Sequence, residues 1–387
     1  MLIAVILAVL VILAAIVVMQ QRQGQAAAPI IGVNRPYPPR PAPPPPGLPA
    51  SDGMRAAVEP GPGDFVIGGI LFNTKTIAQK YALLFAWAAV VIVFGFANSA
   101  FVNWSNVTTI FGSQSYIVVL TLGLILPLTA GDFDLSVAAT MIVSAMTVAI
   151  LNVWYEWPLL PAMLVALAAG AAIGAVNAFL ILYFRIHSLI VTLGMQTLLH
   201  GIAIWISSSQ TVTNVSFPLI KYVIVERIAG LSYIFFYVVI LATVIWYFLQ
   251  YTAQGRRLLF VGRGREVARL SGIRVDQVRA GALIACSMIA ALAGILLVGG
   301  TGSAEPVAQR GMVLFAFAGA FMGATAITPG RFNPWGSFIG VYFLAFCVSG
   351  MQIVGAPSFV QDFIYGGGLI IAVAMSQLAL KRQPQNF

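Results

Sequence analysis

The sequence predicts an all-α polytopic membrane protein with about ten transmembrane helices in one core and one extra N-terminal transmembrane helix. Its 387 residues are 60% apolar and only 8% charged, and the mean hydropathy is +0.95. Soluble globular chains are roughly half apolar and about one quarter charged. Long apolar runs follow one another from Lys75 onward, which is typical of a chain dissolved in lipid.

Two segments precede this core. Residues 1–20 are apolar through Met19, and no Lys or Arg precedes the run, so we expect an anchor helix rather than a cleaved signal peptide. Residues 21–74 hold twelve of the 21 prolines, a composition that favours an extended, disordered linker. Residues 75–382 then form the membrane domain, and we expect residues 1–63 to be dispensable for its activity.

The membrane domain contains ten apolar segments of helical length. They lie near 80–97, 107–130, 134–152, 158–184, 188–207, 230–250, 277–299, 308–325, 335–354 and 358–378. If the connections alternate between two sides, seventeen Lys and Arg residues fall on one side and three, Lys221, Arg227 and Arg310, on the other. Cytoplasmic loops carry the excess of Lys and Arg, so both ends of the core are expected in the cytoplasm. The same rule explains the net charge of +9 without a nucleic-acid partner.

Small residues recur at four-residue steps within several of these segments. One such stripe is Ala166, Gly170, Gly174 and Ala178. In lipid, stripes of small residues let helix backbones approach closely. We therefore assign this stripe to helix packing and to no chemistry.

Charge is concentrated between Gly255 and Arg279, where seven of the nine charged residues are arginines. Arg265 to Leu270 is expected to form a short helix with Val267 and Leu270 on one face, and Gly272 stands where a helix C-cap would fall. An ordinary positive cytoplasmic loop would account for the arginines alone. It would not account for a short helix with an apolar face and a capping glycine.

This stretch is one of four separated motifs. The segment "TAGDFDLSVAA" (Thr129 to Ala139) is similar to a Gly-Gly-x-Asp-Leu-Ser-Val-Gly segment, and "VTLGMQTLLHGIA", followed by "SQTV", to a Thr-Leu-Gly-rich helix. The segment "VGRGREVARLSGIRV" is similar to a coupling loop, and "MGATAITPGRFNPWGSFIG", followed by "VQDFIYGGGLIIAVA", to a C-terminal helix pair. In this order, from about Lys75 to Arg382, they resemble the permease subunits of ribose-, xylose- and galactose-type sugar ABC importers. The chain departs from that pattern at Asp132 and Ala138, where glycines are usual.

The resemblance implies the membrane subunit of an ATP-binding cassette importer that moves a monosaccharide or related polyol across the bacterial inner membrane and is not itself an enzyme. It implies cytoplasmic ATPase subunits that bind ATP and Mg, a periplasmic solute-binding protein, and a second permease copy or paralogue. The implied membrane motif includes Gly131, Asp134, Leu135 and Ser136. The implied ATPase-coupling segment is Gly264, Arg265, Glu266, Val267, Ala268, Arg269, Leu270, Ser271, Gly272 and Ile273.

Asp132 and Asp134 are closely spaced carboxylates near the membrane, and they allow two interpretations. Paired carboxyls can share a proton and perform acid–base chemistry, as in an intramembrane aspartyl hydrolase. Such pairs normally come from two converging helices, whereas these residues are two apart in one segment. We favour Asp134 as the N-cap of the helix that begins "LSVAATMIVSAM".

No pattern predicts a catalytic residue, a metal site or a cofactor held by this chain. His187 and His200 lack metal-ligand spacing, and no phosphate-binding P-loop motif occurs. Five polar residues within the spans either line a translocation path or hydrogen-bond between helices: Gln114, Ser115, Asn177, Gln196 and His200. An ATP-independent secondary carrier is the other transport class, but it normally needs buried ionisable groups, which these spans hardly contain.

Overall fold

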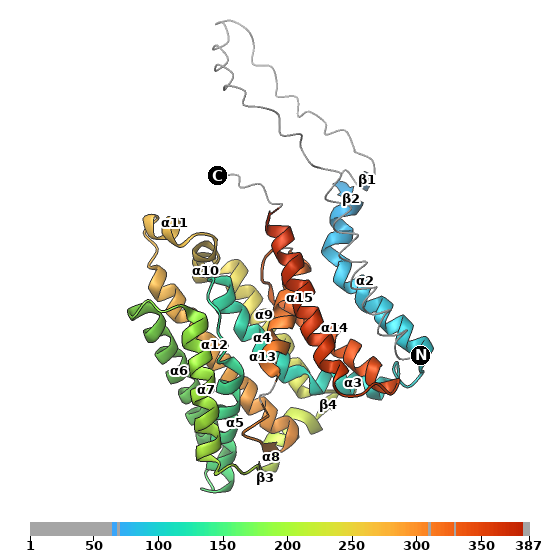
Figure 1. Ribbon diagram of the computed structural model, residues 1–387. Coiled ribbons are helices and arrows are strands. Elements are labelled where there is room, and N and C mark those ends of the chain that lie inside the picture. The colour runs from blue at the N-terminus through green and yellow to red at the C-terminus, as the bar shows by residue number, and fades with distance from the viewer. Residues whose placement is uncertain (1–63, 68–69, 309–310, 329, 382–387) are drawn as a thin grey trace, which may run out of the picture.

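The computed structural model describes residues 64–67, 70–308, 311–328 and 330–381 (Figure 1). The predicted anchor at 1–20 and most of the predicted linker at 21–74 lie outside these residues. The last part of the linker forms a two-stranded antiparallel hairpin of β1 (Asp64–Ile67) and β2 (Ile70–Asn73). The membrane domain follows directly from this hairpin.

Each of the ten predicted segments coincides with a helix or a helix pair. These are α2 (Thr74–Ala97), α3 (Trp104–Ser113) with α4 (Ser115–Thr129), α5 (Val137–Val153), α6 (Leu159–Tyr183), α7 (Ser188–Ile206), α9 (Tyr233–Tyr251), α12 (Val275–Thr301), α13 (Met312–Thr325), α14 (Pro334–Ile353) and α15 (Val360–Lys381). Within the described residues, five of them (α6, α7, α9, α12 and α14) are long and apolar enough to cross a membrane. Helices α3 and α4 together make a sixth, bent by 42°. The all-α polytopic class is therefore confirmed, and the total of ten spans plus one stays a prediction.

Several short elements lie outside the ten predicted segments. They are α8 (Phe217–Ile220), a π-helix (Lys221–Val225), α10 (Ala253–Arg263), α11 (Arg265–Leu270), the pair β3 (Val212–Thr213) with β6 (Ser303–Ala304), and the hairpin of β4 (Arg227–Ile228) and β5 (Leu231–Ser232). Of these, only the position of α11 was predicted. Elements α8, β3 and β4 lie at the end of the molecule opposite α10 and α11 (Figure 1).

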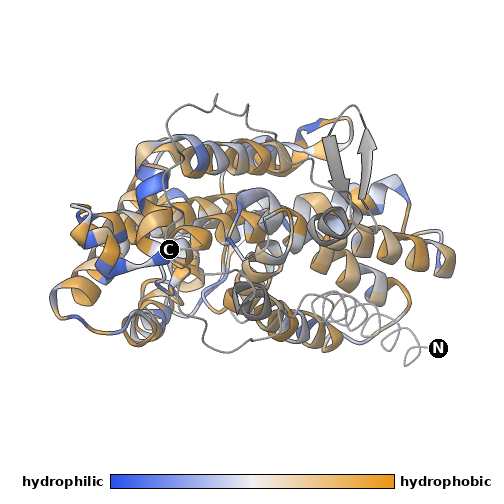
Figure 2. Ribbon diagram, turned by 90° about the horizontal axis from the view of Figure 1, so that it is seen from above, coloured by the Kyte–Doolittle hydropathy of each residue, from blue (hydrophilic) through white to orange (hydrophobic). Residues whose placement is uncertain are grey.

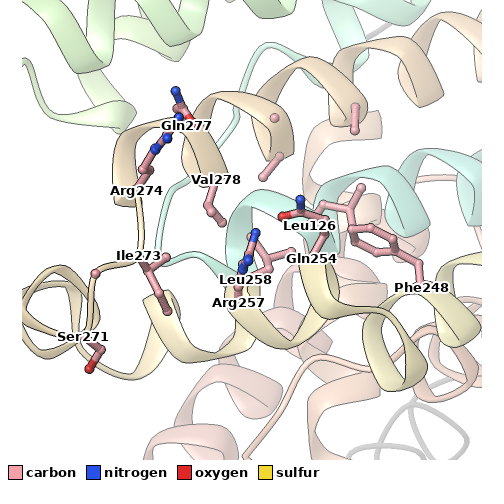
Figure 3. A pocket seen from close by; sticks show the side chains of 14 residues that line it. Leu126, Phe248, Gln254, Arg257, Leu258, Ser271, Ile273, Arg274, Gln277 and Val278 are labelled. Atoms are coloured by element: carbon pink, nitrogen blue, oxygen red, sulfur yellow. The ribbon is translucent and has the colours of Figure 1, made fainter.

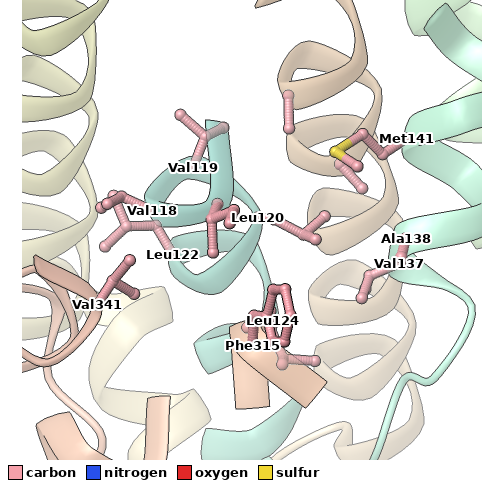
Figure 4. Packing of buried hydrophobic residues seen from close by; sticks show 14 of the residues in the cluster. Val118, Val119, Leu120, Leu122, Leu124, Val137, Ala138, Met141, Phe315 and Val341 are labelled. Atoms are coloured by element: carbon pink, nitrogen blue, oxygen red, sulfur yellow. The ribbon is translucent and has the colours of Figure 1, made fainter. Parts of the chain in front are cut away.

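The core is organised around α4, which is buried along nearly its whole length. Its sequence has no polar face, as expected for a helix surrounded by other helices. It packs against α9, α12, α13 and α14. Figure 4 shows Leu124 of α4 beside Phe315 of α13, and Val118 and Leu122 of α4 toward Val341 of α14. Apolar residues also cover the outer helices, seen from above in Figure 2, as a lipid-facing surface requires.

Helices α6 and α12 approach closely along the predicted stripe of small residues. A Cβ atom added at Gly174 would lie 2.7 Å from Ile284 Cα and 3.0 Å from the Leu283 carbonyl oxygen. A Cβ added at Gly170 would lie 2.8 Å from the Ser287 carbonyl oxygen. Both glycines therefore face backbone atoms of α12, and the packing role predicted for the stripe is confirmed.

The start of α2, the end of α15 and the α10–α11 segment lie at the same end of the molecule (Figure 1). This is the end that the excess of arginines assigns to the cytoplasm. Lys221 and Arg227, which the sequence assigns to the other side, belong to the π-helix and to β4 at the opposite end. The arrangement of the described helices thus agrees with the predicted separation of charge.

Candidate functional site

The arginine-rich stretch forms two short helices between α9 and α12. Helix α10 begins after Thr252, whose hydroxyl accepts a hydrogen bond from the Gly255 N–H at 3.0 Å. Gly264 is extended and separates α10 from α11, which spans Arg265–Leu270 as predicted. Two helices joined by one extended residue make a compact projection at the end of the bundle for which the charge distribution predicts a cytoplasmic location (Figure 1).

Helix α11 ends in a Schellman motif. Gly272 has φ +80°, its N–H donates to the Arg269 carbonyl, and the Ile273 N–H donates to the Ala268 carbonyl, both at 3.0 Å. These bonds satisfy carbonyls that the helix end would leave without partners. The predicted capping role of Gly272 is therefore confirmed, since a side chain is disfavoured at this φ.

The two sides of α11 differ sharply in exposure. Ala268 is fully buried and packs with Val261 of α10 and Val275 of α12. On the other side, Leu270 is 88% exposed and Val267 is 56% exposed. The helix is thus anchored through a small residue and presents two apolar side chains outward, at an end of the protein where no lipid is expected.

A cavity of about 960 Å³ lies beside this projection (Figure 3). Its polar part is lined by Gln254 and Arg257 of α10, by Arg274 just before α12, and by Gln277 of α12. Its apolar part is lined by residues such as Leu126 of α4, Phe248 of α9 and Ala285 of α12. The cavity therefore lies between the α10–α11 helix pair and the central helix α4.

The loop between α4 and α5 holds the second predicted motif. One Asp134 carboxylate oxygen accepts hydrogen bonds from the Ser136 N–H at 2.9 Å and the Ser136 hydroxyl at 2.6 Å. Asn177 of α6 donates its side-chain amide to the same hydroxyl at 2.9 Å. These buried bonds fix the loop to α6, next to Gly131 at φ +79° and the partly buried Leu135.

The prediction that Asp134 is the N-cap of α5 is wrong, because α5 begins at Val137 and its N-cap is Ser136. Asp134 still accepts a hydrogen bond from the Ser136 backbone N–H, but Asp134 itself lies two residues before that cap. Aspartate side chains commonly form such turns with the residue two positions ahead. The turn therefore places the carboxylate just outside the helix rather than at its first position.

Asp132 is the centre of an ion-pair cluster that the sequence did not reveal. Its carboxylate receives Nε and Nη2 of Arg279, each at 2.7 Å, and Nη2 of Arg265 at 3.0 Å. The Asp132 side chain is only 3% exposed, so the two guanidinium groups replace the water that a carboxylate would otherwise need. Asp132 and Asp134 thus have separate partners, unlike a dyad that shares a proton.

The five residues predicted to line a path lie in three places. Gln114 and Ser115 are at the bend between α3 and α4, where Ser115 donates to the Phe111 carbonyl at 2.6 Å and lies 3.1 Å from the Tyr342 hydroxyl. Asn177 of α6 donates a hydrogen bond to Ser136 in the α4–α5 loop region, and Gln196 and His200 lie one turn apart on α7. The two cavities of about 960 and 410 Å³ have other lining residues, so this path stays a prediction.

The described residues contain no group of three His, Cys, Asp or Glu side chains that could hold a metal ion. Cys286 of α12 and Cys347 of α14 are both buried, and His187 caps α7 by accepting the Leu189 N–H at 3.3 Å. Buried charge in the described part of the chain is confined to Asp132 and Asp134. The geometry therefore describes a membrane protein in which the α10–α11 projection is tied to the α4–α5 loop.

Comparison with known proteins identifies the family. Residues 106–373 match the family described as "Branched-chain amino acid transport system / permease component". The chain belongs to this permease family. The match includes both the α4–α5 loop and the α10–α11 projection, and it confirms the permease resemblance seen in the motifs.

Curated relatives align over most of both chains. The D-allose transport system permease protein of Escherichia coli is 29% identical over 80% of this chain and 95% of its own. The ribose import permease protein of Escherichia coli is 28% identical over 79% and 96%, and the L-arabinose ABC transporter permease protein of Azospirillum brasilense is 26% identical over 80% and 90%. No solved structure matches. The family and these relatives are permease components, so this permease is a transport component and not an enzyme.

Proposed function

We propose that this permease is the transmembrane subunit of an ATP-binding cassette importer and carries a monosaccharide or related polyol across the bacterial inner membrane. Relatives named for D-allose, ribose and L-arabinose align with it over 90% or more of their own lengths. Such coverage makes these relatives comparable with this chain over most of both lengths. The relatives' names therefore support a sugar more strongly than any single residue does.

The exposed apolar face of α11 carries the proposal. Leu270 and Val267, 88% and 56% exposed, form a contiguous apolar face at the end that the charge distribution assigns to the cytoplasm, and this face supports a protein partner. We assign this face to a cleft on a cytoplasmic ATPase, which would supply the ATP and Mg sites. Closure of two ATPases would then move α11 and shift the permease between outward-open and inward-open populations.

The assembly follows from the same assignment. Two ATPases need two coupling helices, so a second permease copy or a paralogue would complete the transporter. A periplasmic solute-binding protein would deliver the sugar at the end that carries α8, the β3–β6 pair and the β4–β5 hairpin. We place the ten-helix core and the additional N-terminal span in this frame, with both ends of the core in the cytoplasm.

A branched-chain amino acid is the second candidate solute, because the family's description names that class. The two candidates differ in charge: a sugar is neutral, whereas an amino acid carries a carboxylate and an ammonium group. Buried charges are costly unless they are paired. Among the described residues, the buried charged side chains are Asp132 and Asp134, and both lie in the α4–α5 loop rather than in a membrane helix. This distribution favours the neutral solute.

Uptake by the assembled transporter tests the proposal. Proteoliposomes that contain the permease, its co-expressed ATPase and its solute-binding protein are expected to accumulate labelled ribose, D-allose or L-arabinose only when ATP is present. Labelled leucine serves as the competing substrate. Accumulation of leucine alone would overturn the sugar assignment, and accumulation that needs an ion gradient instead of ATP would overturn the importer assignment.

A further inference from the structure

The Asp132 cluster joins three elements that are distant in the sequence. Asp132 lies in the α4–α5 loop, Arg265 is the first residue of α11, and Arg279 lies in the second turn of α12. The carboxylate therefore connects α11, the proposed ATPase-docking helix, to α12 and to the α4–α5 loop.

Other contacts reinforce this connection. Arg265 Nη2 also donates to the Gly131 carbonyl at 2.9 Å and lies 3.3 Å from the Ala130 carbonyl. Just before α11, Gly262 of α10 packs directly on the Thr129 carbonyl, with no room for a Cβ atom. The base of the projection thus rests on the last residue of α4 and the first residues of its loop.

The two arginines bind the carboxylate in different ways. Arg279 is 13% exposed and makes a two-nitrogen contact, whereas Arg265 is 41% exposed and uses a single nitrogen for all its bonds. A bidentate buried pair is geometrically demanding, and a half-exposed single contact exchanges more easily with water. A cavity of about 410 Å³ borders both arginines and gives the Arg265 side chain room to move.

We propose that Asp132, Arg265 and Arg279 form an ionic latch that transmits movement of α11 to the α4–α5 loop. Arg279 holds the carboxylate permanently against α12, and Arg265 pulls on the same carboxylate and on the Gly131 carbonyl when α11 moves. Arg265 is thus a positioning residue for transport. The proposal rests on the proposed docking of α11 to an ATPase, and it assigns a role to Asp132, one of the two positions where the motif departs from its family pattern.

Arg265→Gln in the complete transporter tests the latch. We measure the ratio of labelled sugar accumulated to ATP hydrolysed, with the sugar that the wild type accumulates fastest among ribose, D-allose and L-arabinose. The variant is expected to retain its ATPase on purification while this ratio falls about tenfold, the factor that corresponds to one charge-assisted hydrogen bond. Arg263→Gln, at an exposed arginine outside the latch, is expected to keep the wild-type ratio.

Lysine variants separate charge from geometry. Arg265→Lys keeps a charge that can satisfy contacts made by one nitrogen. Its ratio of sugar accumulated to ATP hydrolysed is therefore expected to return most of the way to the wild-type value. Arg279→Lys cannot reproduce a two-nitrogen contact and is expected to stay low.

A double variant separates coupling from simple stability. Asp132→Asn with Arg279→Gln removes both members of the buried pair and leaves only the half-exposed Arg265 charge, so its melting temperature is expected to exceed that of Asp132→Asn alone. Its ratio is expected to remain low. A wild-type ratio in Arg265→Gln, or a restored ratio in the double variant, would overturn the latch while leaving the importer intact. A wild type that neither retains an ATPase nor accumulates sugar would overturn both proposals.

Discussion

Leu270→Asp is expected to leave the permease folded and inserted but to abolish ATPase co-purification and solute-stimulated ATP hydrolysis. The side chain is 88% exposed in the free permease, so a carboxylate there is fully hydrated and costs the fold little. In the docked complex the same carboxylate would be buried without a partner, which costs on the order of several kcal/mol and weakens binding about 100-fold or more. Co-purification from membranes and ATPase assays in proteoliposomes measure both effects.

Arg263→Gln is the matched comparison for this variant, because it also alters an exposed side chain of the same projection. It is expected to retain the ATPase, since exposed charges at the edge of an interface contribute little. A merely topological basic loop requires the reverse ranking, because only the arginine change removes positive charge. Full ATPase retention by Leu270→Asp would refute the assignment of α11 as the docking helix.

Gly174→Val is expected to destabilise the membrane domain by about 3 kcal/mol through overpacking. Its Cβ would meet Ile284 Cα at 2.7 Å and the Leu283 carbonyl at 3.0 Å, and backbone atoms of α12 cannot move away as a flexible side chain would. The expected result is a lower melting temperature in detergent and less protein in the membrane. Transport by the remaining folded protein is expected to follow its amount.

Gly201→Val provides the control for this substitution. Gly201 also lies in a membrane helix, α7, but an added Cβ there has nothing within 4 Å. Its melting temperature is expected to stay near that of the wild type. Equal losses in the two variants would mean that the α6–α12 contact does not limit stability and that any added bulk on a glycine is harmful.

The features predicted most accurately from sequence are the local ones. Helix α11 has the predicted bounds because Gly264 and Gly272 mark its two ends within ten residues of sequence. The small-residue stripe on α6 was likewise visible as a four-residue period, and its partner α12 carries its own small residues. Such signals need no knowledge of which helices are neighbours.

The features that the sequence did not predict depend on contacts between distant residues or on weak local signals. Asp132 binds arginines 133 and 147 positions away, so its charge could be paired only after the helices were placed. The break between α3 and α4 falls at Gln114, directly after the pair Gly112 and Ser113, a local signal that the predicted single segment 107–130 did not take into account. The N-cap of α5 was misplaced by two residues because Asp134 and Ser136 are both suitable capping residues.

Cross-linking from position 270 tests the docking of α11 most directly. The chain has two cysteines, Cys286 and Cys347, and both are buried, so Leu270→Cys provides the accessible thiol for a photoreactive label. In native membranes, the label is expected to capture an ATP-binding cassette ATPase, and a label at the exposed Trp205 of α7, through Trp205→Cys, is expected to capture none. Failure to capture the ATPase from position 270, or equal capture from position 205, would contradict the account.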